Sequence, residues 1–208
     1  MPVPEFDLYL VTDRSQTQGR DLLSVLRRAL DGGVRAIQLR EKDLSGKDLF
    51  KLAEKTRALC DRYNAQLLIN DRIDVALAVN AAGIQLGKAS IPITTARALL
   101  GPVKLIGYSA HSLDEAQGAQ QSGADFLLFG PIYFTQSKAQ YGMPQGVAAL
   151  KKIVEKVALP VYAIGGIKPA SIIAVRRAGA RGVALISAII SADDPQSAAE
   201  SMVRLLRR

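Results

Sequence analysis

Short apolar runs alternate with longer segments of helical period along the chain. The runs are rich in β-branched residues, so we interpret each of them as a buried strand. The eight predicted strands are Asp7–Asp13, Ala36–Glu41, Gln66–Asp71, Gly83–Gly87, Lys104–Ala110, Phe126–Ile132, Pro160–Gly166 and Gly182–Ile189.

Segments of helical period separate these strands. Residues 21–30 and 48–63 are two of them, and the second places Leu49, Leu52, Ala53, Thr56, Leu59 and Cys60 on one face. Ser112 followed by Glu115 predicts a capping box at the start of a helix. Asp194-Pro195 predicts another helix start, with the cap followed by proline.

Strands that alternate with helices predict a parallel sheet with helical crossovers. Eight such units in 208 residues match a small (β/α)₈ TIM barrel. A doubly wound sheet would carry a glycine fingerprint after its first strand, whereas the first glycine after that strand is Gly19. Gly33, Gly83, Gly123 and Gly179 precede or begin strands and fit helix ends that turn back to the barrel floor. Because no linker interrupts the pattern, we expect one barrel domain over residues 1–208.

The amino-acid composition excludes several classes of protein. The chain is 49% hydrophobic and 22% charged, as in globular proteins, and has no apolar run of about 18 residues that could span a membrane. The first residues lack a signal-peptide pattern, so we expect a cytoplasmic protein. One cysteine and one histidine exclude an internal disulfide and a Cys/His zinc cluster.

The net charge is +8, from 27 Lys and Arg against 19 Asp and Glu. Most of these cations are scattered pairs in helical segments, and only 5% of residues are aromatic, so we do not expect nucleic-acid binding. A positive surplus also suits an anionic small molecule such as a phosphate ester. Net charge alone does not separate these explanations.

Catalytic residues of a barrel lie at the carboxyl ends of its strands and in the loops that follow. The second strand ends with Gln38, Arg40 and Lys42 on one face, a set that suits a polyanion. The alternative is a salt-bridged strand end, with Glu41 or Asp71 as the partner.

The third strand ends at Asn70-Asp71, where a carboxylate could hold Mg²⁺ against phosphate oxygens or could cap a helix that begins at Arg72. The fifth strand brings Ser109 and His111 to one face. His111 is the only histidine, and it serves either in binding or proton transfer or as a structural residue.

Two further segments suggest phosphate binding. The long loop after the sixth strand contains Thr135, Ser137 and Lys138, which suggest a phosphate cradle or lid, with a plain surface loop as the alternative. Gly165-Gly166 and Ser187 follow strands seven and eight, where barrels recurrently bind phosphate. The alternative for these glycines is a tight turn without a ligand.

Six motifs in order resemble the thiamin phosphate synthase family and its sister group, the thiazole tautomerases. They are QLREK (38–42), IND (69–71), YSAHS (108–112), GPIYFTQSK (130–138), AIGGI (163–167) and LISAI (185–189). The resemblance implies that 4-amino-2-methyl-5-pyrimidinylmethyl diphosphate joins 4-methyl-5-hydroxyethylthiazole phosphate, which yields thiamin phosphate and pyrophosphate.

The resemblance also implies the roles of individual residues. The residues that would bind the pyrimidine diphosphate are Gln38, Arg40, Lys42, Asn70, Ser109 and Lys138, and Glu41 is also expected to bind substrate. The residues that would bind the thiazole phosphate are Thr135, Gln136, Ser137, Gly166, Ile186 and Ser187. Asp71 would bind Mg²⁺, the implied cofactor. The residues expected to act in catalysis are Arg40, Lys42, Ser109, His111 and Lys138.

The sequence departs from the family at one position. Family members carry a second magnesium aspartate in a GQED-like sequence after the fourth strand, where this chain has Gly87-Lys88-Ala89-Ser90. Tautomerases lack that aspartate too and use a histidine at the place of His111, so a tautomerase is the alternative function. A catalytically silent regulator is a third hypothesis. The sequence leaves open whether the chain forms a homo-oligomer.

Overall fold

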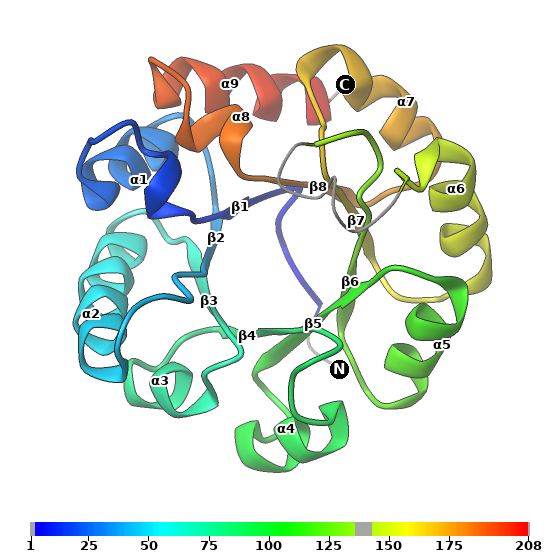
Figure 1. Cartoon of the computed structure of the whole chain (residues 1–208), viewed down its shortest axis with the longest axis horizontal. Helices are drawn as coiled ribbons and strands as arrows, with labels where there is room; N and C mark the ends of the chain where they lie inside the picture. Colours follow the sequence, from blue (N-terminus) through cyan, green and yellow to red (C-terminus); the bar gives the residue numbers. More distant parts are fainter. Residues whose placement is uncertain (1–2, 136–142, 208) are drawn as a thin grey trace.

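Eight parallel strands form a closed barrel in the computed structural model, which describes residues 3–135 and 143–207. Each strand pairs with its neighbours in sequence, and β1 closes the barrel by pairing Leu8 with Val183 of β8 (Figure 1). The strands are β1 Leu8–Val11, β2 Ala36–Leu39, β3 Gln66–Asn70, β4 Gly83–Leu86, β5 Leu105–Ala110, β6 Phe126–Phe129, β7 Val161–Ile164 and β8 Gly182–Leu185. The predicted TIM barrel is therefore confirmed.

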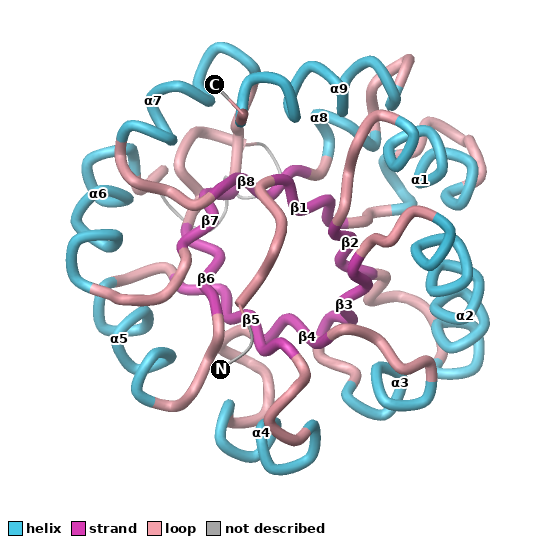
Figure 2. The backbone as a smooth tube through the Cα atoms, turned by 180° about the vertical axis from the view of Figure 1, so that it is seen from behind, coloured by secondary structure: helices cyan, strands magenta, loops and turns pink. Residues whose placement is uncertain are grey.

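Helices surround the barrel as an outer ring (Figure 2). They are α1 Leu22–Asp31, α2 Gly46–Arg62, α3 Ile73–Ala78, α4 Ile93–Leu100, α5 Leu113–Gln121, α6 Gly146–Lys156, α7 Ile172–Arg177, α8 Ser187–Ile190 and α9 Pro195–Leu206, with 3₁₀ turns η1 Arg14–Gln16 and η3 Pro169–Ser171. Each longer helix buries one apolar stripe; in α1 this stripe contains Leu22, Val25, Leu26, Ala29 and Leu30.

Both predicted helix starts are confirmed, although the capping box at Ser112 forms only in part. Ser112 Oγ accepts a hydrogen bond of 3.1 Å from the Glu115 N–H at the start of α5. The Glu115 carboxylate accepts from the N–H of His111, one residue before the position that a capping box would use. Asp194 caps α9 by accepting from the N–H groups of Gln196 and Ser197.

One predicted strand is too long. We expected residues 182–189 to be extended, but β8 ends at Leu185 and residues 187–190 form the short helix α8. Ile189 and Ile190 are fully buried, so their side chains continue the apolar run after the backbone has turned. A short buried run does not by itself distinguish a strand from a buried helix.

The glycine pattern holds at three of its four positions. Gly33, Gly123 and Gly179 have φ between +91° and +96°, the left-handed region used at helix ends. The prediction of a helix end is wrong for Gly83, which is the first residue of β4. A Cβ atom there would lie 2.1 Å from the Leu105 carbonyl oxygen, so glycine allows β4 and β5 to approach closely.

An aromatic cluster fills the barrel interior near the amino-terminal ends of the strands. The segment before β1 crosses the end of the barrel (Figure 2). The Phe6 ring of this segment lies 5.1 Å from the ring of Tyr9 and 5.0 Å from that of Tyr162. Tyr162 Oη donates a 2.7 Å hydrogen bond to the Phe6 carbonyl. Burial raises the pKa of both tyrosines, which stay neutral. This packing closes the amino-terminal end of the barrel, and the polar side chains lie at the opposite end.

Among the residues that the structure describes, no helix is long and apolar enough to cross a membrane. The cytoplasmic location remains a prediction.

Candidate active site

Two adjoining cavities open at the carboxyl ends of the strands. The more polar one has a volume of about 420 Å³, and β2, β3, β5 and the loop after β4 contribute to its wall. Its lining includes Gln38, Arg40, Lys42, Asn70, Asp71, Lys88, Ser90, Ser109 and His111. The structure therefore brings together the residues predicted for the diphosphate, apart from Lys138, which lies outside the described residues.

The second cavity, of about 570 Å³, lies beside β6, β7 and β8. It is lined by Thr135, Gly166, Ile186 and Ser187, four of the residues predicted to bind the second substrate. Gln16, His111, Ile164 and Ile186 line both cavities, so the two spaces meet at these residues. Two ligands could therefore lie in contact at this junction.

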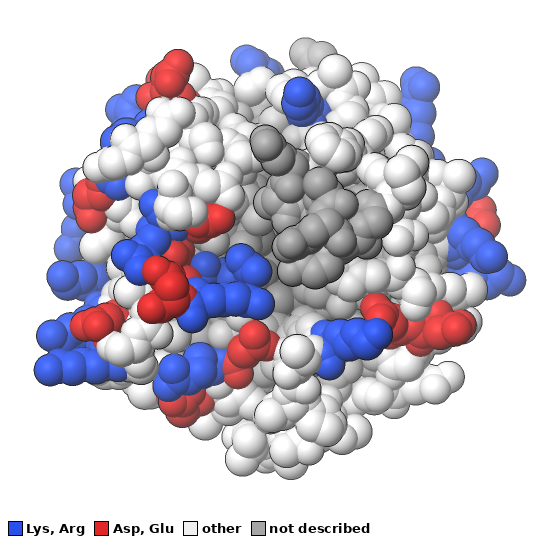
Figure 3. All heavy atoms as spheres, viewed as in Figure 1, with Lys and Arg blue, Asp and Glu red and all other residues white. Residues whose placement is uncertain are grey.

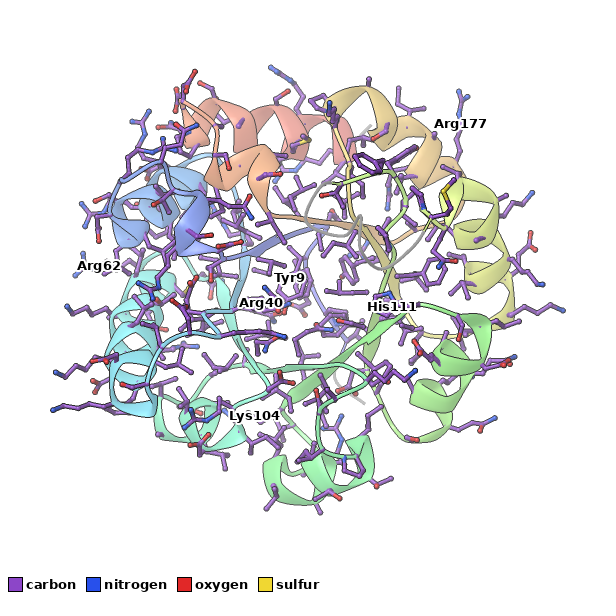
Figure 4. All side chains as sticks on the ribbon, viewed as in Figure 1. Tyr9, Arg40, Arg62, Lys104, His111 and Arg177 are labelled. Atoms are coloured by element: carbon purple, nitrogen blue, oxygen red, sulfur yellow. The ribbon has the colours of Figure 1, made fainter. Side chains whose placement is uncertain are left out.

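Arg40 and Lys42 face the polar cavity without ion-pair partners. Neither forms a salt bridge within 4.0 Å among residues 3–135 and 143–207, so the salt-bridged strand end is not what the structure shows for them. Lys and Arg side chains gather on one side of the central hollow (Figure 3), and Arg40 and His111 lie on opposite sides of the barrel mouth (Figure 4). Two unpaired cations at a cavity wall are well placed for an anion.

Glu41 faces away from the polar cavity and joins two strand ends. Its side chain is 2% exposed and accepts hydrogen bonds from Thr12 Oγ1 at 2.6 Å and from the Arg14 N–H at 3.1 Å. Burial raises the pKa of Glu41, and these bonds counteract that shift only in part. Its placement fits a residue that holds β1 and β2 in position for Arg40.

Asp71 lies beside Ser90, the residue at the place of the second aspartate. Ser90 Oγ donates a hydrogen bond to Asp71 Oδ1 and accepts one of 2.7 Å from the Gly87 N–H. Asn70 Nδ2 donates to Asp71 Oδ2 at 2.8 Å. The alternative role of Asp71 as a helix cap is not observed, because Arg72 occupies the N-cap of α3.

Two buried amides lie at or behind the wall of the polar cavity. Gln38 is 2% exposed, and its side chain lies beside the Tyr9 hydroxyl. Gln85 is also 2% exposed, and its amide forms a 3.1 Å hydrogen bond with Ser109 Oγ. We did not predict Gln85, which reaches the cavity through Ser109 rather than lining it. Such groups can orient a polar ring above the aromatic floor.

His111 is held firmly from two sides. Its Nδ1 lies 2.6 Å from the Gly130 carbonyl oxygen, and its main-chain N–H donates to Glu115 Oε2 at 2.8 Å. Because a carbonyl oxygen only accepts, the Nδ1 atom is the donor in this contact. The ring is thus fixed at the junction of the two cavities.

The Gly165-Gly166 turn packs against the loop after β6. Both glycines have positive φ, and a Cβ atom on Gly166 would lie 2.5 Å from the Phe134 carbonyl oxygen. Glycine is therefore required for this turn, which also forms part of the second cavity. Gln136 and Ser137, predicted for the same cavity, lie outside the described residues.

Comparison with known proteins assigns the family. The sequence model described as thiamine monophosphate synthase matches residues 8–189. The chain belongs to the thiamine monophosphate synthase family.

Full-length relatives agree with this family. A Geobacter sulfurreducens protein, provisionally named a thiamine-phosphate synthase, is 52% identical over 97% of this chain and 95% of its own length. The thiamine-phosphate synthase of Clostridium novyi is 42% identical over 96% of this chain and 98% of its own. The solved thiamine phosphate pyrophosphorylase from Pyrococcus furiosus superposes with a TM-score of 0.88 at 37% identity, and covers 97% of this chain and 95% of that one. None of these three names refers to the tautomerase alternative.

The donor atoms around Asp71 decide whether this member of the thiamine monophosphate synthase family can hold Mg²⁺. Within residues 3–135 and 143–207, no group of three or more His, Cys, Asp or Glu side chains could bind a metal alone. Asp71 supplies one carboxylate, with Ser90 Oγ and the Asn70 amide next to it. Mg²⁺ is commonly bound by one or two carboxylates together with substrate phosphates. The donor set fits a Mg²⁺ ion that shares its ligands with a diphosphate.

Two residues after β1 also line the polar cavity, and we did not predict them. Asp13 Oδ2 accepts a 2.6 Å hydrogen bond from Gln16 Nε2, and both residues line the cavity opposite β5. Although partial burial acts to raise the pKa of Asp13, hydrogen bonds from Ser15 and Gln16 and the nearby charge of Arg40 hold it below its ordinary value. Their position after a barrel strand was the signal that could have identified them.

Proposed function

We propose that the protein is a thiamin phosphate synthase, which joins 4-amino-2-methyl-5-pyrimidinylmethyl diphosphate to 4-methyl-5-hydroxyethylthiazole phosphate. The observation that carries the proposal is the pair of adjoining cavities, one lined by unpaired cations and one by a glycine turn and Ser187. Their junction would hold the methylene carbon of one substrate next to the thiazole nitrogen of the other.

In this reaction the bond between the methylene carbon and the diphosphate oxygen breaks, and pyrophosphate leaves with the electron pair. The thiazole nitrogen donates its lone pair to that carbon, so a thiazolium forms. Arg40 and Lys42 would bind the diphosphate and stabilise its growing charge. Bound Mg²⁺, held by Asp71 and the diphosphate, would supply further charge neutralisation.

The remaining polar residues would position the two rings. Gln38, Asn70 and Ser109 surround the space expected for the pyrimidine, and Gln85 orients the Ser109 hydroxyl. Gly166, Ser187 and Thr135 would hold the thiazole phosphate, together with Gln136 and Ser137 by resemblance to the family, which assigns Lys138 to the diphosphate. His111 contacts both spaces and would bind substrate at the junction. No general base is needed, because the attacking nitrogen carries no proton to lose.

The direct test mixes purified protein with both substrates and Mg²⁺ and measures thiamin phosphate after oxidation to fluorescent thiochrome. We expect Mg²⁺-dependent product formation. A known synthase in a parallel reaction serves as the control. If only the control forms product, the proposal is wrong, and the protein should be assayed for isomerisation of the thiazole carboxylate phosphate with His111→Ala as the comparison.

Arg40→Ala should lower the turnover number by about 10²-fold, because it removes a cation from the departing diphosphate. Arg62→Ala, on the outer side of α2 (Figure 4), is the matched control and should leave turnover unchanged. Steady-state kinetics on both variants provide the test. Arg40→Ala activity within about a factor of two of wild type would exclude this role.

A further inference from the structure

Lys88 is a cation at the polar cavity to which neither the proposed mechanism nor the family comparison gives a role. It lies in the loop between β4 and α4 and lines the cavity together with Arg40 and Lys42. The loop is well fixed, since the Ser90 N–H donates to the Gly87 carbonyl at 3.0 Å and Ser90 Oγ accepts from the Gly87 N–H. The backbone of Lys88 is therefore held in a fixed turn.

The Lys88 side chain is held only weakly in this structure. Its Nζ lies 4.0 Å from Glu115 Oε1, and its side chain is 84% exposed. Exposed ion pairs of this kind contribute little to stability, so leaving Glu115 costs Lys88 little free energy. Glu115 keeps its other bond, in which Oε2 accepts from the His111 N–H at 2.8 Å. The amine can therefore move to a ligand without disturbing the residues around it.

The loop also places Lys88 next to the proposed metal ligand. Ser90, two residues further along the same turn, donates directly to the Asp71 carboxylate. A diphosphate that shares a Mg²⁺ ion with Asp71 would lie beside this turn. Among the described lining residues only Asp13 and Asp71 are acidic, and both already accept hydrogen bonds. The ligand would therefore be the strongest anion within reach of Lys88.

We propose that Lys88 is a substrate-binding residue that exchanges Glu115 for an oxygen of the diphosphate. It supplies positive charge on the side of the cavity where Asp71 contributes the metal-binding carboxylate. This inference rests on the proposed function, because it needs a diphosphate in this cavity. It implies that diphosphate binding depends on Lys88 most strongly when Mg²⁺ is scarce.

The test titrates pyrophosphate, the expected product, into wild-type protein and Lys88→Gln by isothermal calorimetry, at high and at low Mg²⁺. We expect Lys88→Gln to weaken binding by about tenfold, equivalent to about 1.4 kcal/mol, and by more at low Mg²⁺. Lys151→Gln is the matched control, because Lys151 Nζ also has a carboxylate partner, Glu155, at 3.9 Å but lies on α6 away from the cavity. That variant should bind pyrophosphate as wild type does.

Glu115→Gln separates ligand binding from a structural ion pair. It removes the charge that competes for Lys88, so pyrophosphate should bind at least as tightly as in wild type. If both variants weaken binding equally, or if Lys88→Gln binds like Lys151→Gln, the inference is wrong. Thiamin phosphate formation by the wild type in the same preparation would then leave the proposed function standing, whereas wild-type protein that neither binds pyrophosphate nor forms product would overturn both.

Discussion

Adjacent residues at the end of β2 have opposite tasks. Arg40 faces the cavity and has no ion pair among the described residues, whereas Glu41 is buried and accepts hydrogen bonds from Thr12 and Arg14. The Arg40 N–H donates to Thr12 Oγ1 at 2.9 Å, so the same threonine fixes both residues. An acidic residue of the motif thus builds the strand end that presents its basic neighbours.

Ser90→Asp should lower the Mg²⁺ concentration for half-maximal activity by about tenfold, a gain of about 1.4 kcal/mol in metal binding. The reason is that Ser90 Oγ contacts Asp71, so a carboxylate at position 90 adds a second acidic ligand. Without metal the two carboxylates repel, so Mg²⁺ with pyrophosphate should raise the melting temperature of this variant more than that of wild type. Ser90→Ala is the control without added charge. An unchanged or higher Mg²⁺ requirement for Ser90→Asp would show that position 90 does not face the metal.

At the scale of elements, helix α9 shows how the outer ring is attached. Gly32, the C-cap of α1, lies so close to α9 that a Cβ atom would be 2.4 Å from the Gln196 carbonyl oxygen. Arg28 of α1 donates to Asp194 Oδ1 at 2.8 Å, where Asp194 also caps α9. One carboxylate therefore starts a helix and joins it to its neighbour.

Asp194→Asn should reduce stability above about pH 4 and have a smaller effect as the pH falls toward 2. Hydrogen bonds from Ser197 and Arg28 lower the pKa of Asp194 from 3.8 to about 2. A lowered folded-state pKa gives stability that is present above the unfolded value and lost as the pH falls through the folded value. We expect the variant to melt about 2–4 °C below wild type at neutral pH and to approach it at the acidic end, as measured by calorimetry. A difference that stays constant with pH would contradict this account.

At the scale of the whole molecule, the closed barrel separates a sealed end from an open one. The aromatic cluster around Phe6 fills the lower interior, and the two cavities occupy the opposite end. Closure makes the eight strand ends converge, so residues as distant in sequence as Arg40 and Ile186 line one cavity. The site is therefore a property of the closed ring rather than of any one strand.

Phe6→Ala should destabilise the fold by about 3–5 kcal/mol, because it opens a hole among the three aromatic rings packed against Phe6. Thermal or chemical unfolding measures this loss, and the loss should exceed that of any exposed substitution in the same segment. Val3→Ala is such a control, since Val3 is 67% exposed. Equal unfolding of the two variants would mean that the residues before β1 are not part of the cooperative core.

The sequence by itself determined the order of strands and helices and the inward-facing polar positions. Alternation along β2 and β5 placed Arg40, Ser109 and His111 on inner faces, because side chains of a strand alternate between its two sides. The barrel followed from eight repeated units, since each strand and helix had to bury an apolar face. These features depend on local periodicity, which a single sequence contains.

Only the tertiary structure decided which polar groups are paired and which face a ligand. Glu41 is buried against Thr12, Ser90 contacts Asp71, and Gln85 joins Ser109 across neighbouring strands. The tertiary structure also sets the end of β8, because the apolar residues after it form the buried helix α8. Each of these contacts joins residues distant in sequence or depends on what surrounds a segment, and strand closure is the physical event that brings them together.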